Sequence, residues 1–86
     1  MNQEIHNYDK KLVKLITNSI FKDRITNIQE LKDRAYRYDL REEDVESIFR
    51  ILLFDGFVKK EDIPLSKDGY SIYDSKIYEL EREDLI

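Results

Sequence analysis

The stretch LREEDVESIFRILLFDGFVKK, residues 40–60, decides the predicted fold because its hydrophobic pattern changes partway. Its first part places apolar residues on one face of a helix with 3.6 residues per turn: Val45, Ile48, Phe49, Leu52 and Leu53. Gly56 can take the left-handed conformation that ends a helix, and Phe57–Lys60 then reads as a strand. The stretch therefore predicts a buried helix, a stop and a strand.

A first helix is predicted before this stretch, starting near Tyr8 with Asp9 or Asn7 as its cap. Its apolar stripe consists of Leu12, Val13, Leu15, Ile16 and Ile20. Residues 22–26 are too short and too polar for a helix, so we expect a brief strand at the edge of a sheet there.

A second helix is predicted from Asn27, an N-cap with Glu30 in the capping-box position, to about Tyr38. Its inward face is expected to consist of Ile28, Leu31, Ala35 and Tyr38. Leu40 follows in the turn between the second and third helices, and we expect its side chain to fill the core between these two helices.

The regular spacing of apolar residues becomes weaker beyond Lys60. Residues 61–69 contain the single proline, Pro64, and a Lys-Asp-Gly turn, which together predict a wing loop. Tyr70–Tyr73 nearly alternates, and Lys76–Leu80 alternates cleanly, so the second of these is expected to pair with Phe57–Lys60. Residues 1–7 and 82–86 are expected to be loose tails.

The predicted order is helix, short strand, helix, helix, strand, loop and strand. This order is typical of an α+β winged helix-turn-helix, with three helices, a small antiparallel sheet and a wing, and we expect residues 1–86 to form one such domain. A plain three-helix bundle is the main alternative. The break at Gly56 and the two β-rich segments after it argue against that alternative.

The composition limits where and how the protein works. It has 86 residues, 40% of them charged, and a formal net charge of −4. It has no cysteine, which fits an intracellular protein of the cytoplasm or nucleus better than a secreted one. No apolar run approaches the roughly 20 residues that span a membrane, so no membrane partner is expected.

The sequence predicts a binding protein rather than an enzyme. It has no Ser-His-Asp set, Gly-rich phosphate loop or metal-spaced group, so no catalytic residue, cofactor or metal is expected. The carboxylates of residues 42–44 lack the spacing of a calcium loop and read as a solvated helix start. His6, the single histidine, reads as part of a solvated tail.

Three segments carry a family resemblance: Leu40–Ile48, Leu52–Val58 with its leucine pair and Phe-Asp-Gly, and Lys76–Tyr78. They resemble a winged-helix repeat of the initiation subunit of eukaryotic RNA polymerase III and of the beta subunit of archaeal transcription factor E. The likeness covers about half the chain, within Asn27–Leu80. It implies a winged helix that works in transcription. Many members of that family also carry an iron–sulphur cluster on cysteines, which this chain lacks.

A DNA-binding function requires cations where the phosphates would lie. Residues 1–38 hold eight basic and five acidic side chains, and residues 39–86 hold seven and fourteen. The third helix starts with Glu42, Glu43 and Asp44, which would repel phosphate from a helix that usually enters the major groove. Contact with DNA is therefore expected to be weak and directed at the backbone. The candidate contacts are Lys32, Arg34, Arg37, Lys59, Lys60 and Lys67.

A protein-docking function rests on apolar residues that remain after the core is assigned. If several are exposed together, they would form the apolar centre of an interface. The candidates are Ile51, Phe54, Phe57, Tyr70 and Tyr73, and the alternative for Phe54 and Phe57 is a small satellite core over the sheet edge.

The sequence thus predicts a winged-helix module of transcription machinery that docks on a protein partner, with weak contact to duplex DNA. The alternative is a small DNA-binding transcriptional regulator that forms a homodimer.

Overall fold

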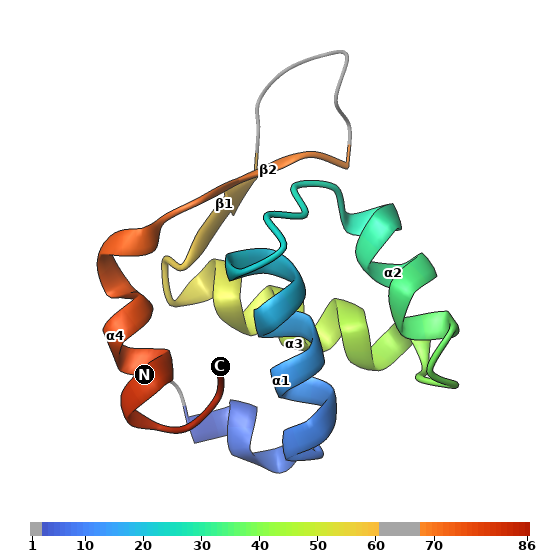
Figure 1. Ribbon diagram of the computed structural model, residues 1–86, viewed down its shortest axis with the longest axis horizontal. Coiled ribbons are helices and arrows are strands. Elements are labelled where there is room, and N and C mark those ends of the chain that lie inside the picture. Colours follow the sequence, from blue (N-terminus) through green and yellow to red (C-terminus); the bar gives the residue numbers. More distant parts are fainter. Residues whose placement is uncertain (1–2, 61–67) are drawn as a thin grey trace.

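The structure is a computed structural model that describes residues 3–60 and 68–86. Figure 1 shows how its helices and strands are arranged. They are η1 (Gln3–Asn7), α1 (Lys10–Phe21), α2 (Ile28–Tyr36), α3 (Glu42–Phe54), β1 (Val58–Lys60), β2 (Tyr70–Ile72), η2 (Asp74–Lys76) and α4 (Ile77–Arg82). Within the described ranges they make a compact α+β fold of four α-helices and a small two-stranded antiparallel sheet.

The first two helices begin at side-chain caps. The Asp9 carboxylate accepts a hydrogen bond from the Lys11 N–H at 2.8 Å. The Asn27 side chain accepts from the N–H groups of Gln29 and Glu30 at 2.9 and 3.2 Å. These bonds satisfy amides that have no partner within the helix, and both predicted caps are confirmed.

Three helices end in the same hydrogen-bonded turn. In each, one residue has a positive φ: Asp39 after α2 (59°), Gly56 after α3 (81°) and Asp84 after α4 (57°). The next N–H donates to the carbonyl five positions back: Leu40 to Ala35, Phe57 to Leu52 and Leu85 to Leu80. This is the Schellman motif, and in each case it turns an apolar residue back onto the core.

The sheet pairs β1 with β2, in the register Val58 with Ile72 and Lys60 with Tyr70. The segment before α2 lies along the other edge of β2, because the Tyr70 N–H donates to the Thr26 carbonyl and Asn27 forms a bridge to Gly69. The brief strand predicted at residues 22–26 is thus a single bridge at Asn27.

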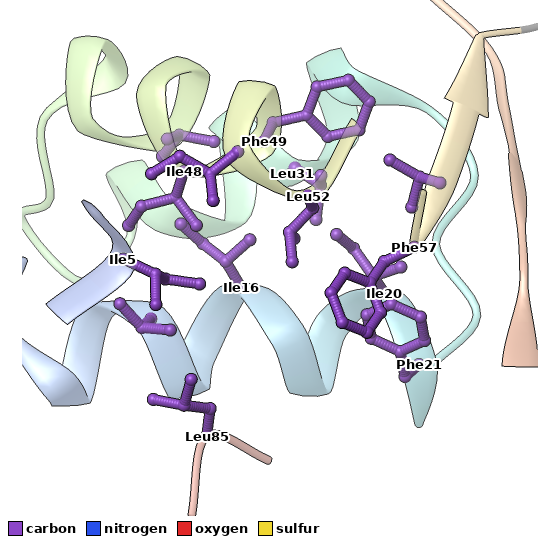
Figure 2. Close-up of a cluster of buried hydrophobic side chains, with 14 of the residues drawn as sticks. Ile5, Ile16, Ile20, Phe21, Leu31, Ile48, Phe49, Leu52, Phe57 and Leu85 are labelled. Carbon is purple, nitrogen blue, oxygen red and sulfur yellow. The ribbon is translucent and has the colours of Figure 1, made fainter. Parts of the chain in front are cut away.

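The core lies between α1 and α3. Figure 2 shows Ile16 and Ile20 of α1 pointing toward Leu52 of α3. Phe57 packs its ring edge-on against Phe21, with the ring centroids 6.3 Å apart. All five side chains are buried, which stabilises the contact between the two helices and the start of the sheet.

A second aromatic contact joins the sheet to α3. The rings of Tyr70 and Phe49 lie 4.8 Å apart between centroids, and the Tyr70 hydroxyl donates to the Ile25 carbonyl. Burial raises the pKa of the Tyr70 hydroxyl above its ordinary value of 10.0, so this group remains a donor at neutral pH.

The strand predicted at Lys76–Leu80 is wrong. Residues 77–82 form α4, and β2 takes the place beside β1. The alternation was misleading because Ile77 and Leu80 also lie three positions apart, on one face of a helix. Leu80 is buried and Ile77 packs against the core.

Residues 3–7 and 82–86, which belong to the tails predicted to be loose, pack against the rest of the fold. Ile5 of η1 is completely buried, and Leu85 is 2% exposed. The Thr17 hydroxyl of α1 donates to the Leu85 carbonyl, and Asp84 forms ion pairs with Lys10 and Lys14 at 2.8 and 3.5 Å. Residues 82–86 are therefore held on α1 by apolar burial and by charge.

The remaining corrections concern α2 and the loop. α2 ends at Tyr36, and Tyr38, predicted to face inward, is 64% exposed. Leu40 is half-buried at the edge of the core. Most of the predicted wing loop, residues 61–67, lies outside the described residues. The purely helical alternative is wrong, since the sheet is present.

Candidate functional site

Three of the five predicted interface residues are buried, so they cannot form an exposed patch. Ile51 is 6% exposed. Phe57 is turned inward by the Schellman motif, and Tyr70 faces the core from β2. Phe54 remains 82% exposed, and Tyr73 is partly exposed just after β2.

Phe54 lies beside a shallow depression of about 280 Å³ between the last two turns of α3 and the N-terminal segment. Tyr8 and Arg50 also line this depression. Arg50 and Phe54 are four positions apart and therefore share one face of the helix. We refer to Tyr8, Arg50 and Phe54 as the Phe54 surface.

The acidic start of α3 is bound to α2. Lys32 lies 2.6 Å from the Glu46 carboxylate and 3.1 Å from that of Glu42. Its side chain is only 16% exposed. The hydrogen bond to Glu46 raises the pKa of Lys32, and the same bond lowers the pKa of Glu46, so both groups stay charged. Lys32 thus joins the two helices and already has two carboxylate partners.

Arg34 is also paired with a carboxylate. Its guanidinium donates to the Asp23 carboxylate and, at 3.3 Å, to the Ser19 hydroxyl. Arg37, one residue beyond α2, is exposed. Of the three basic candidates predicted at α2, only Arg37 has no ion-pair partner in the described part of the chain.

The structure describes two of the three basic residues predicted for the wing. Lys59 and Lys60 are exposed on β1, while Lys67 lies outside the described residues. Lys60 lines a depression of about 270 Å³ together with Lys32, Glu46 and Arg50. The carboxylate of Glu46 lies among these cations, which makes the depression less attractive to a phosphate.

Arg50 is a residue that the sequence analysis did not select. It lines both the depression beside Phe54 and the one beside Lys60, so it lies between the two predicted kinds of contact. The signal was present in the sequence, since Ser47, Arg50 and Phe54 follow the helical spacing of one outward face.

The described residues contain no group of three or more His, Cys, Asp or Glu side chains that could hold a metal ion. Within residues 3–60 and 68–86, no helix combines the length and apolar character needed to cross a bilayer. Comparisons with family models, curated proteins and solved structures found no match.

Proposed function

We propose that this chain is a winged-helix module of transcription machinery that docks on a protein partner through the Phe54 surface. The winged-helix assignment is supported by the order of the elements and by the hydrogen bonds that join the segment before α2 to β2. The assignment to transcription is supported by the resemblance of residues 40–48 and 52–58 to the polymerase III subunit and the archaeal factor.

The observation that carries the docking proposal is the contrast between Phe54 and the cations of α2. A large aromatic side chain is 82% exposed, whereas Lys32 and Arg34 are already paired with carboxylates. Exposed aromatic residues beside an arginine are typical of the side chains that dominate protein interfaces. The partner that fits has an apolar pocket beside a carboxylate, which would take Phe54 and Arg50.

Contact with duplex DNA is proposed to be weak and limited to the backbone. Of the predicted DNA contacts, Arg37, Lys59 and Lys60 are exposed. Glu42 and Glu46 of α3 pair with Lys32, and Glu43 pairs with Arg41. A duplex that entered along α3 would meet these carboxylates before it met the cations.

The docking proposal is tested with a photo-crosslinking phenylalanine analogue at position 54, in cells that express the protein. We expect cross-links to a subunit of a transcription complex. The matched control places the analogue at Tyr36, which is 80% exposed at the last residue of α2 and does not line the depression beside Phe54. Equal cross-linking from both positions, or cross-links only to proteins outside transcription, would reject the proposal.

The alternative is a small, homodimeric DNA-binding regulator, favoured by the exposure of Lys59 and Lys60 on β1. Titration of random duplex at low and moderate salt distinguishes the two functions. If the alternative holds, Lys59→Glu with Lys60→Glu abolishes binding, and the log–log salt slope falls by about 0.9 for each phosphate that the protein no longer neutralises. If the docking proposal holds, duplex binding is weak and Phe54→Asp leaves it unchanged.

A further inference from the structure

A groove of about 680 Å³ lies between the start of α1 and the turn that joins α2 to α3. It is larger than the depression beside Phe54 or the one beside Lys60, each under 300 Å³. Both of its walls lie in the lower half of Figure 1. We refer to it as the α1–turn groove, and the proposed function does not use it.

The lining of the α1–turn groove includes Leu12, Leu15, Leu40 and Tyr38. Leu12 is buried, Leu15 and Leu40 are half-buried, and Tyr38 is 64% exposed. Apolar side chains thus line the groove at several depths, and an aromatic side chain stands at its edge. A partner that covers Tyr38 would remove a large apolar area from water.

The charged residues around the groove are mainly acidic. Asp9, Asp39 and Asp44 line it, against the two cations Lys11 and Arg41. The Arg41 guanidinium lies 3.2 Å from the carboxylate of Glu43, which offsets its charge. The groove therefore combines an apolar lining with an excess of one negative charge, which favours a cationic apolar segment over an acidic one.

We propose that the α1–turn groove binds a basic amphipathic helix of a protein partner, whose apolar side chains enter the groove while lysines or arginines face Asp39 and Asp44. A helix fits better than an added strand, because the groove is walled by α1 and a turn and has no sheet edge to pair with. A small molecule fits less well, since small-molecule sites usually enclose most of the ligand, and the edge of this groove is open at Tyr38 and Asp39.

The groove and the Phe54 surface adjoin at Tyr8 and Asp9, but the residues that the tests change lie apart. Asp44 lies in the first turn of α3 and Phe54 at its last residue. A helix rises 1.5 Å per residue, so these positions are roughly 15 Å apart along the axis. Variants of the two surfaces can therefore be tested independently, and failure of one proposal leaves the other standing.

The test is a selection from a phage-displayed library of random 16-residue peptides on the full chain, followed by fluorescence anisotropy with the selected peptides. We expect enriched peptides with apolar residues at helical spacing, flanked by lysine or arginine. Tyr38→Ser should weaken binding at least tenfold, because exposed tyrosines often carry interface energy. The matched control Tyr78→Ser changes an exposed tyrosine of α4 that does not line the groove, and it should leave the affinity unchanged.

A second variant tests the charge. Asp39→Asn with Asp44→Asn removes two carboxylates and keeps the shape, and asparagine also tolerates the positive φ of residue 39. We expect at least a fivefold loss of affinity at 50 mM salt and a much smaller loss at 500 mM, where charges are screened. Thermal unfolding of each variant shows whether it is folded.

The proposal is overturned if the selection enriches no peptide, or if enriched peptides are acidic or bind the Tyr38→Ser protein equally well. It is also overturned if sedimentation shows a dimer of the chain itself that Tyr38→Ser dissociates, because the groove would then be occupied by a second copy.

Discussion

The turns after α3 and α4 use the same hydrogen bonds but place different residues at positive φ. After α3 the residue is Gly56, and the buried residue that follows is Phe57. After α4 the residue is Asp84, followed by Leu85. Both turns return an apolar side chain to the core, and only the first carries the glycine that such a turn favours.

We expect tertiary contacts to help maintain the second turn, where glycine is absent. Asp84 has a φ that residues with a side chain seldom adopt. Its carboxylate lies 2.8 Å from the Lys10 ammonium and 3.5 Å from that of Lys14. The unfavourable backbone conformation therefore places the Asp84 carboxylate beside two cations of α1. Gly56 needs no such partner, because glycine adopts positive φ at little cost.

The largest effect is expected at the residue that follows the first turn. Phe57 is completely buried and packs against Phe21, so Phe57→Ala should lower the free energy of unfolding by roughly 3–5 kcal/mol. Chemical denaturation measures this loss. The matched control is Phe54→Ala, three residues earlier, where the exposed side chain should cost about 0.5 kcal/mol or less. Similar losses at the two positions would mean that the turn at Gly56 is misplaced.

The second-largest loss of stability is expected at Leu85, the residue that follows the turn after α4. Leu85→Ala should cost roughly 2–5 kcal/mol, less than Phe57→Ala, because the buried side chain that is removed is smaller than a phenyl ring. The exposed Glu81 of α4 provides a control, and Glu81→Ala should change stability by about 0.5 kcal/mol or less. Equal stability of the Leu85→Ala protein and the parent would show that residues 82–86 are loose.

The same comparison explains how much of the fold could be predicted from the sequence. α3, Gly56 and β1 were predicted correctly, because a change of hydrophobic period and a glycine are strong local signals. α4 was missed because its six residues allow both a strand and a helix pattern. Its end at Asp84 carries no glycine, and the ion-pair partners of Asp84, Lys10 and Lys14, lie far away in the sequence.

Less of the candidate site could be predicted. The exposure of Phe54 follows from its place off the apolar stripe of α3. Ile51 also lies off that stripe but is buried, so its burial depends on tertiary packing that the helical pattern does not reveal. The pairing of Lys32 with Glu46 joins two helices, and such contacts have no local periodicity. The α1–turn groove likewise depends on how α1 meets the turn before α3.

A loss of about 1 kcal/mol in the free energy of unfolding is expected at Gly56, in the turn after α3. Gly56→Ala should cost roughly that much because alanine is strained at a φ of 81°. Steric contact adds little, since the nearest atom to a new Cβ is the Lys76 Nζ at 3.8 Å. Gly56→Asn is the control and should cost less, because asparagine tolerates positive φ better. If alanine and asparagine were equally harmful, a clash rather than the backbone conformation would be responsible.

The smallest effect is expected at the second turn, where Asp84→Asn keeps a residue that tolerates positive φ but removes the charge. The hydrogen bond with Lys10, aided by Lys14, lowers the pKa of Asp84 below its ordinary value of 3.8. A carboxylate with a lowered pKa in the folded state stabilises the fold above the unfolded-state pKa, and this stabilisation is lost as the pH falls through the folded-state pKa. The parent should therefore melt slightly higher than Asp84→Asn at pH 7, and the two should converge as the pH falls below about 4.

High salt should also narrow the gap between the parent and Asp84→Asn, because the ion pairs are exposed. The exposed Glu81→Gln serves as the control for removal of a negative charge on the same segment. If Asp84→Asn melts like the parent at every pH, the positive φ of Asp84 is tolerated without help from α1, and the proposed reason for the difference between the two turns is wrong.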